Sequence, residues 1–290
     1  MRQTTKLRQL LAADGPLLVP GAYDGASARV AHTLGHSAVY LTGFGMEASM
    51  LGMPDIGLAS EAEVVVHAGR IAAAVPVPVI SDADTGYGGV INVHRTVRDF
   101  ERAGIAGIHI EDQALPKRCG GMAGRRVVPV AEMEARLRAA LAARSDPDFV
   151  VIARTDAKAE HGLDGVAERL NAYLAAGADL GMIAEPFEAD ELRRLAAAVD
   201  GPLAMVGGVP EWPASMLGRD ELAEIGVKLV LYAVTGLAAA MKVQMAVYGD
   251  LLQNGRLGPA STEALMDLEA LSELMGLSDW NAIEAAATKP

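Results

Sequence analysis

Eight short apolar runs rich in β-branched residues recur along the chain, and an Ala-rich amphipathic segment separates each run from the next. The runs occupy residues 17–23, 37–43, 77–84, 107–112, 149–156, 180–186, 202–208 and 228–234. The segments predicted to be helices are 26–34, 61–74, 90–103, 130–143, 165–176, 190–199 and 218–225. Continuous apolar strands that alternate with helices indicate a parallel sheet buried on both faces. Eight such units predict an α/β fold, the (β/α)8 TIM-type barrel, with a doubly wound open sheet as the competing architecture.

The chain shows no internal division. Its 290 residues are 51% hydrophobic, which is enough to bury a sizeable core. No Pro-, Gly- or Ser-rich linker interrupts it, so residues 1–290 are predicted to form a single domain. A tail over about residues 236–290 extends beyond the eighth run, is helical in pattern and is broken near residues 254–260. Such extra C-terminal helices commonly pack on a partner subunit, so we expect a homo-oligomer.

Composition excludes several classes of partner. The net charge is −12 and no Lys/Arg stripe is visible, so neither nucleic acid nor a membrane surface is an expected partner. No apolar run reaches the ~18 residues that a membrane span needs. The single cysteine cannot form an internal disulfide, and the N-terminal segment is too charged for a signal peptide. A cytoplasmic location is therefore expected.

Carboxylates gather where two of the predicted strands end. Asp82 and Asp84 close the third run, and Glu111 and Asp112 close the fourth. In a (β/α)8 barrel these ends form the active site, where crowded carboxylates repel one another unless a cation binds between them. Oxygen ligands without a His or Cys cluster favour Mg²⁺, with Mn²⁺ as the second possibility. A lone acid such as Asp156 can equally be a helix N-cap.

Two further side chains at this rim indicate chemistry. Arg154 ends the apolar fifth run, where it either forms a structural salt bridge or clamps an anionic substrate. Cys119 stands in a loop beside Lys117 and Arg118, and neighbouring cations lower the pKa of a thiol. The glycines that follow allow this loop to close as a mobile lid. We predict that Cys119 is catalytic; a small buried residue is the structural alternative. His109, inside the fourth run, is predicted to be a core histidine.

At these residues the sequence resembles the isocitrate lyase/phosphoenolpyruvate mutase superfamily. Within it, the branch of 2-methylisocitrate lyases, dimethylmalate lyases and carboxyphosphonoenolpyruvate mutases is the most similar. The match covers nearly the whole chain, and its specific pieces are YLTGFG, MPDIG, DADTGYG, HIEDQ with PKRCGG, and IARTDA. The resemblance implies a barrel, a Mg²⁺ cofactor and a small 2-oxo or 2-hydroxy carboxylate substrate. It also implies a dimer or tetramer that exchanges C-terminal helices.

The resemblance carries roles over to matching positions. The metal site it implies is formed by Asp55, Asp82, Asp84 and Glu111. The substrate-binding residues it implies are Thr42, Gly43, Phe44, Asp82, Lys117, Arg118, Gly120 and Arg154. The catalytic residues it implies are Tyr40, Glu111, Cys119 and Arg154.

A cysteine in this loop is typical of the carbon–carbon lyases of the family. In the implied reaction Tyr40 removes the 2-hydroxyl proton of a hydroxy acid held on Mg²⁺. The C2–C3 bond breaks, a 2-oxo acid remains on the metal, and Cys119 protonates the carbanion of the leaving carboxylate as general acid. The predicted activity is a Mg²⁺-dependent lyase for a 2-hydroxydicarboxylate, a substituted malate or a methylisocitrate-like acid.

The part of the site that binds the leaving half departs from the lyase pattern. Gly121 replaces their His, Ala184 replaces their Glu with Glu185 one place later, and segment 204–210 lacks their Asn. We therefore expect a substrate other than isocitrate or 2-methylisocitrate, with a more apolar distal group. The alternatives are a P–C bond mutase or hydrolase, or a 2-oxo acid decarboxylase, on the same metal site. A non-catalytic binding protein is a third possibility.

Overall fold

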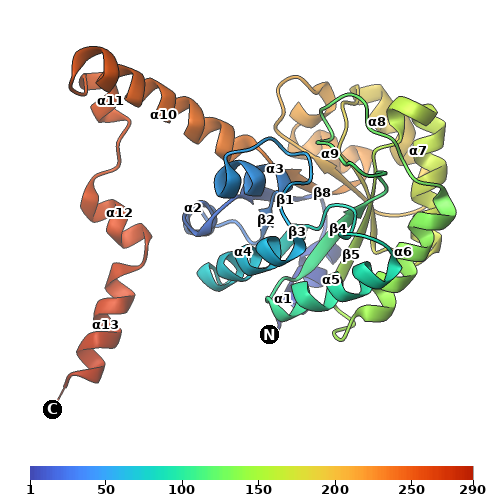
Figure 1. Ribbon diagram of the computed structural model, residues 1–290, viewed down its shortest axis with the longest axis horizontal. Coiled ribbons are helices and arrows are strands. Elements are labelled where there is room, and N and C mark those ends of the chain that lie inside the picture. Colours follow the sequence, from blue (N-terminus) through green and yellow to red (C-terminus); the bar gives the residue numbers. More distant parts are fainter. Residues whose placement is uncertain (290) are drawn as a thin grey trace.

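The computed structural model describes residues 1–289, and eight parallel strands close into a barrel in the order β1 to β8 (Figure 1). The strands are β1 (Leu17–Ala22), β2 (Val39–Leu41), β3 (Val79–Asp82), β4 (Gly107–Glu111), β5 (Val150–Thr155), β6 (Leu180–Ile183), β7 (Leu203–Val206) and β8 (Val227–Tyr232). The closing pair β1–β8 places Leu17 opposite Leu229. The predicted (β/α)8 barrel is confirmed, and the open sheet is excluded because β1 and β8 pair.

Helices surround the barrel. They are α1 (Gln3–Ala12), α2 (Gly25–Thr33), α3 (Gly43–Met46), α4 (Glu61–Ala74), α5 (Val90–Arg102), α6 (Val130–Ala143), α7 (Lys158–Ala175), α8 (Ala189–Ala198) and α9 (Arg219–Ile225), with a π-helical turn η1 (Glu47–Leu51) and a 3-10 turn η2 (Pro213–Met216). The sequence pattern did not predict α1 or the α3–η1 segment, since neither has a long apolar stripe. Helix α7 begins earlier than expected, at Lys158, and Gly162 interrupts its helical backbone with a φ of 65°.

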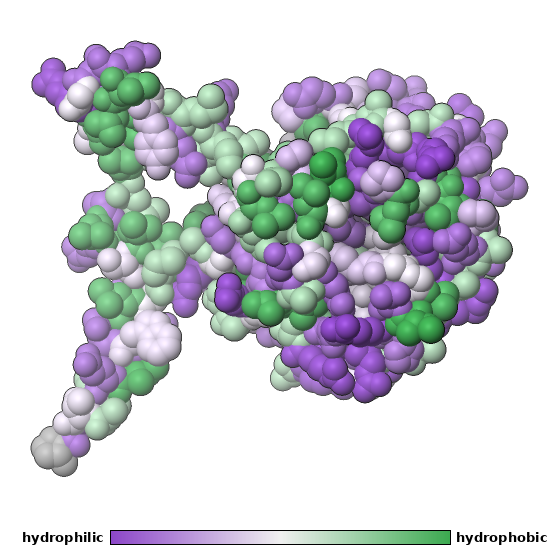
Figure 2. All heavy atoms as spheres, in the orientation of Figure 1, coloured by the Kyte–Doolittle hydropathy of each residue, from purple (hydrophilic) through white to green (hydrophobic). Residues whose placement is uncertain are grey.

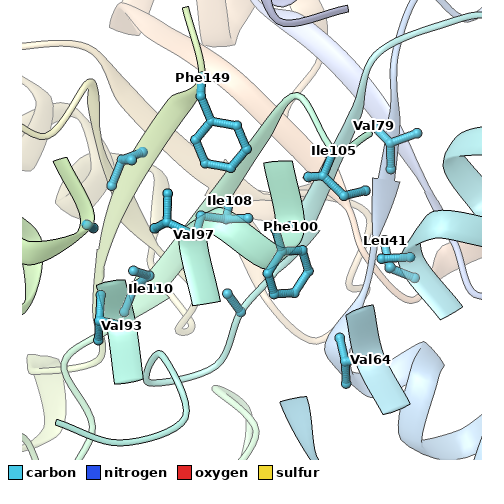
Figure 3. Close-up of a cluster of buried hydrophobic side chains, with 14 of the residues drawn as sticks. Leu41, Val64, Val79, Val93, Val97, Phe100, Ile105, Ile108, Ile110 and Phe149 are labelled. Carbon is cyan, nitrogen blue, oxygen red and sulfur yellow. The ribbon is translucent and has the colours of Figure 1, made fainter. Parts of the chain in front are cut away.

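A core between strands and helices supports the barrel rim. Val93, Val97 and Phe100 recur on one face of α5 and are fully buried. Figure 3 shows this face toward Ile108 and Ile110 of β4. The spacing is that of a helix with one apolar stripe. Because the outer side chains of β4 are fixed in this way, its C-terminal Glu111 is held at the barrel mouth.

The C-terminal segment forms an arm that leaves the barrel (Figure 1). It consists of α10 (Thr235–Asn254), α11 (Pro259–Glu263), α12 (Leu268–Leu274) and α13 (Leu277–Ala287). Gly255, with a left-handed φ of 65°, ends α10, and Pro259 begins α11, which explains the predicted interruption. The arm passes α2, where Arg29 Nη1 donates a hydrogen bond to the carbonyl of Leu274 (3.4 Å).

Many apolar side chains of the arm are exposed, and Figure 2 shows hydrophobic residues along it. Leu252 is 87% exposed, Leu268 78% and Met245 77%. Across residues 1–289, no helix combines the length and the apolar character needed to cross a membrane.

Candidate active site

A cavity of about 420 Å³ opens where the strands end, a size that suits a small ligand. The predicted site residues that line it are Tyr40, Thr42, Phe44, Asp55, Asp82, Cys119, Gly120 and Arg154. They come from the ends of β2, β3 and β5 and from two loops, so the fold brings together segments that lie far apart in the sequence.

The acidic side of the cavity begins where β3 ends. The backbone N–H of Asp84 donates to Asp82 Oδ1 (2.8 Å), which turns the chain back toward the mouth. Asp84 has a φ of 47° and Tyr87 a φ of 56°, a conformation that is uncommon outside glycine and collects at functional sites. Gly43 packs so closely on the Asp82 carboxylate that a Cβ there would overlap with it. Burial raises the pKa of Asp84 to about 7.

Lys117 reaches into this group of acids. Its Nζ forms ion pairs with Asp55 and with Asp84 Oδ1 (2.5 Å), and its side chain is almost fully buried. The backbone of the loop that carries Lys117 is also held at Asp55, because the N–H of Cys119 donates to the carbonyl of Asp55 (3.1 Å). The structure therefore shows the loop closed over the site. In this closed arrangement of residues 1–289, no three His, Cys, Asp or Glu side chains converge as a ready coordination shell.

The donor set nevertheless fits Mg²⁺. Magnesium keeps several of its waters and commonly takes only one or two protein carboxylates, so it needs no closed cage. Glu111 Oε1 is buried without a hydrogen-bond partner, and burial raises the pKa of Glu111 well above its ordinary value. A cation would satisfy this oxygen. Asp82 and Glu111 are the residues that would hold it, joined by Asp84 and Asp55 where Lys117 withdraws.

Arg154 is paired on both sides. Its Nη1 lies 2.9 Å from Glu111 Oε2, and its Nε and Nη2 donate to the two oxygens of Asp156 (3.1 and 2.8 Å). Asp156 also accepts from Gln113 Nε2 (2.5 Å). The salt bridge to Glu111 exists as the structural interpretation expected, and Arg154 still lines the cavity. Asp156 acts as the partner of Arg154, a role that strand-end position alone did not indicate.

Tyr40 and His109 form a buried pair. The Tyr40 hydroxyl lies 2.8 Å from His109 Nε2. His109 is fully buried, as its position in β4 predicted, and burial lowers its pKa to about 4, so the ring is neutral at pH 7. Burial, with Asp82 nearby, raises the pKa of Tyr40. The contact with Tyr40 could have been anticipated only from the inward orientation of position 109.

The thiol of Cys119 differs from expectation. Burial raises its pKa to about 11, and the Asp55 carboxylate adds to the shift. The expected net lowering is wrong: Lys117 and Arg154 do lower the pKa of this thiol, but burial and the Asp55 carboxylate outweigh them. Arg118 is exposed and is not among the residues that line the cavity. A protonated thiol at neutral pH is suited to donating a proton.

A buried ion pair holds in place the loop that carries the Cys119 thiol. Arg125 donates to the carbonyls of Gly120 and Met122, the latter at 2.5 Å, and pairs with Glu185 Oε1 (2.5 Å). The other oxygen of Glu185 accepts from the backbone N–H of Lys158 (2.9 Å). The Glu185 carboxylate, displaced by one position from the lyase pattern, is thus used to close the loop.

Asp112, beside Glu111, has a structural role. Its carboxylate accepts from Thr155 Oγ1 (2.7 Å), Tyr173 OH (2.8 Å) and Arg169 Nη1 (3.1 Å). These bonds direct it toward α7 and away from the cavity lining.

The opposite side of the cavity is apolar. It is lined by Ala184, Val206, Val209, Trp212, Val234, Leu237, Ala238 and Met241. These residues end or follow β6, β7 and β8, or lie on α10. The sequence had singled out Ala184 and segment 204–210 as the distal half of the site. It missed Trp212 and the α10 residues, the latter because α10 was assigned to a tail outside the barrel. Gly121 packs here too: a Cβ on it would lie 3.2 Å from Trp212 Cζ2.

Comparison with known proteins agrees with this site. The family model described as phosphoenolpyruvate phosphomutase matches residues 7–252. The chain is 38% identical to the 2,3-dimethylmalate lyase of Eubacterium barkeri over 284 residues, 98% of both chains. It is 39% identical to the 2-methylisocitrate lyase of Shewanella oneidensis over 251 residues, 86% of this chain and 85% of the relative.

Solved structures are also similar. An oxaloacetate acetylhydrolase bound to 3,3-difluorooxalacetate superimposes with a TM-score of 0.92 at 36% identity, covering 99% of this chain and 98% of the other. A phosphonopyruvate hydrolase bound to oxalate and Mg²⁺ superimposes with a TM-score of 0.90 at 30% identity over the whole of both chains. The barrel, the acidic rim and these similarities place the chain in the phosphoenolpyruvate mutase/isocitrate lyase superfamily.

Proposed function

We propose that the protein is a Mg²⁺-dependent lyase that cleaves the C2–C3 bond of a 2-hydroxydicarboxylate to a 2-oxo acid and a carboxylate. The observation that carries this proposal is the protonated Cys119 thiol, which lines the same cavity as Tyr40, Asp82 and Arg154. A general acid must hold its proton at the working pH, and a pKa of about 11 meets that condition. The lyases among the relatives add support.

Substrate binding would begin at the end of β2. Thr42 and Phe44 line the cavity, and the backbone N–H groups of Gly43 and Phe44, in the first turn of α3, would receive the carboxylate of the hydroxy acid. Bound Mg²⁺ would polarise the 2-oxygen and offset the negative charge of substrate and carboxylates. Arg154 would contact the same oxygens with the N–H groups that Glu111 and Asp156 leave unused.

Two proton transfers complete the reaction. Tyr40 accepts the 2-hydroxyl proton at its phenolic oxygen as its own proton passes to His109 Nε2, 2.8 Å away. The freed electron pair forms the C=O of the 2-oxo acid, the C2–C3 bond breaks, and its electron pair remains on C3. The Cys119 thiol then gives its proton to C3, so the second product leaves as a stable carboxylate.

The test is release of 2-oxo acid from malate, 2-alkylmalates, 2,3-dimethylmalate and 2-methylisocitrate, with Mg²⁺ or EDTA. We expect Mg²⁺-dependent release that collapses in Cys119→Ser. Release that survives in Cys119→Ser would refute the general-acid role, and failure of the whole panel would refute the lyase proposal.

A second candidate is hydrolysis of the C–C bond of a 2-oxodicarboxylate. It is favoured by the TM-score of 0.92 with an oxaloacetate acetylhydrolase. Release of oxalate from oxaloacetate, in place of 2-oxo acid from hydroxy acids, would identify it. P–C chemistry is disfavoured because the side of the cavity opposite the acids carries no cation for a phosphoryl group.

We also propose that the arm packs on a second copy of the chain, in a dimer or a tetramer. Its exposed Met245, Leu252 and Leu268 are costly in water. A groove of about 700 Å³ between α2, the start of α10 and α12 offers an apolar surface for such packing. Light scattering with size-exclusion chromatography tests this, and a monomeric protein at micromolar concentration would contradict it.

A further inference from the structure

The cavity has two chemically different sides. Asp55, Asp82, Arg154 and Cys119 line the side formed by β3, β5 and their loops. In a closed barrel of eight strands, β7 lies across from β3. The lining from β6 to β8 and α10 contains neither a charged nor a hydroxyl-bearing side chain. A substrate whose 2-hydroxy acid group is bound on the acidic side therefore extends toward apolar side chains on the other side.

None of the described residues that line this side is a cation. Lys117 lies among the acids of the other side, and Arg125 is paired with Glu185. An additional carboxylate placed on the apolar side would lose its hydration without gaining a counter-charge, which is strongly unfavourable. Ala184 adds to this, since the residue that follows β6 has only a methyl side chain and Met182 of β6, which also lines the cavity, is uncharged.

We propose that the apolar side is a subsite for a hydrocarbon substituent on C3 of the substrate. The inference rests on the proposed function, which fixes C1 and C2 at the metal and C3 next to Cys119. The subsite is the set Val206, Val209, Trp212, Leu237, Ala238 and Met241. The substrate class is thus the 3-alkyl-substituted 2-hydroxydicarboxylates, cleaved to a short 2-oxo acid and a longer-chain carboxylate.

The cleavage balances without a co-reactant. For ⁻OOC–C(OH)R′–CHR–COO⁻, breaking C2–C3 gives ⁻OOC–CO–R′ and R–CH₂–COO⁻. The hydroxyl proton is taken up by Tyr40, and the proton delivered to C3 comes from Cys119. The group R remains on the apolar side throughout, so it contributes to binding and takes no part in proton transfer.

Binding can be measured without turnover. N-alkyl oxamates carry the 2-oxo acid group and an alkyl chain but no bond that this chemistry cleaves. Titration calorimetry with Mg²⁺ and the methyl to hexyl members should show Kd falling about fourfold for each methylene until the cavity is filled. A Kd that stays constant or rises along the series overturns the subsite.

Turnover separates this inference from the proposed function. With 2-methyl-3-alkylmalates, pyruvate release per enzyme should show kcat/KM rising with chain length, and 2-methylisocitrate should be at least about 100-fold poorer because of its extra carboxylate. Pyruvate release that is insensitive to chain length would overturn the subsite but leave the lyase intact. No pyruvate at all, with the oxamate gradient present, would overturn the lyase but leave the subsite intact.

A matched pair of variants places the subsite on α10. Ala238→Leu fills the cavity and should reduce the hexyl-to-methyl ratio of kcat/KM by tenfold or more. Ala239→Leu adds the same side chain one position away, at an exposed site that does not line the cavity, and should leave that ratio unchanged. Both keep a good helix former, so folding is preserved. Equal ratios in the two variants would overturn the assignment.

Discussion

Gly120 and Gly121, adjacent in the loop that carries Cys119, should respond very differently to the same added methyl group. At Gly120 a Cβ would lie 3.0 Å from the carbonyl carbon of Ala184, overlap with the carbonyl oxygen, and approach Arg154 Nη2 to 3.2 Å. Backbone cannot rotate away as a side chain can, so Gly120→Ala must displace the loop. At Gly121 a Cβ meets only Trp212 Cζ2 at 3.2 Å, which a few tenths of an ångström relieve.

The magnitude follows from geometry. Restoring an ordinary contact at Gly120 needs a loop shift on the order of 1 Å, and such a misplacement of a catalytic group costs about 100-fold in rate. Gly120→Ala should therefore lower kcat about 100-fold, whereas Gly121→Ala should stay within about threefold. Neither glycine has a positive φ, so alanine suits both backbones and global stability should change by less than about 1 kcal/mol.

The assay is steady-state 2-oxo acid release by both variants on the best substrate of the panel, with urea unfolding as the check on stability. Wild-type kcat in Gly120→Ala would refute the reasoning, since the loop could not then close on Ala184 during turnover. Equal losses in both variants would refute it too, because the contact with the β6 end would not be the cause.

Three further predictions concern single acids and the thiol. Cys119→Ser should lower kcat by about 10²- to 10⁴-fold with KM nearly unchanged. In the wild type the thiol should remain an effective proton donor up to about pH 10, which a pH–rate profile checks. Because the pKa of Asp84 is raised to about 7, a proton competes with Mg²⁺ for this carboxylate below that pH. The Mg²⁺ affinity should therefore fall by up to about tenfold per pH unit below about pH 7 and level off above it. Titration calorimetry in two buffers should detect proton release on Mg²⁺ binding at about pH 6 but little at about pH 8. Asp112→Ala should lower the free energy of unfolding by about 3–5 kcal/mol in urea denaturation, because Arg169 is left buried without its counter-ion.

The sequence predicted the barrel because the strand pattern is repeated eight times, and strands that are buried on both faces need continuous apolar runs. It also predicted that Asp82 and Arg154 would meet, because strand ends share one rim in this architecture, whereas Tyr40 was placed in the site by the family resemblance and Cys119 by its loop and that resemblance. Periodicity and topology are properties of whole segments, so they can be predicted without knowledge of side-chain contacts.

What the sequence did not predict depends on contacts across the rim. The pKa of Cys119 was expected to fall because Lys117 is two residues away, yet burial of the thiol raises the pKa by more than Lys117 and Arg154 lower it. Trp212 and the face of α10 carry no motif, and only the closed barrel brings them to the cavity. Charge compensation and the shape of a cavity are set by tertiary structure, so composition around a residue is a weak guide to them.

The separation of acids and hydrocarbon onto opposite arcs of the rim also matters for how the protein can diversify. Substitutions after β7 or along α10 leave the contacts around Asp82 and Glu111 untouched, since the arcs share no side-chain bond in the described residues. If the proposed function holds, selection, or a combinatorial library at Val206, Val209 and Ala238, can therefore change the substrate range step by step while the proposed proton transfers at Tyr40 and Cys119 are kept.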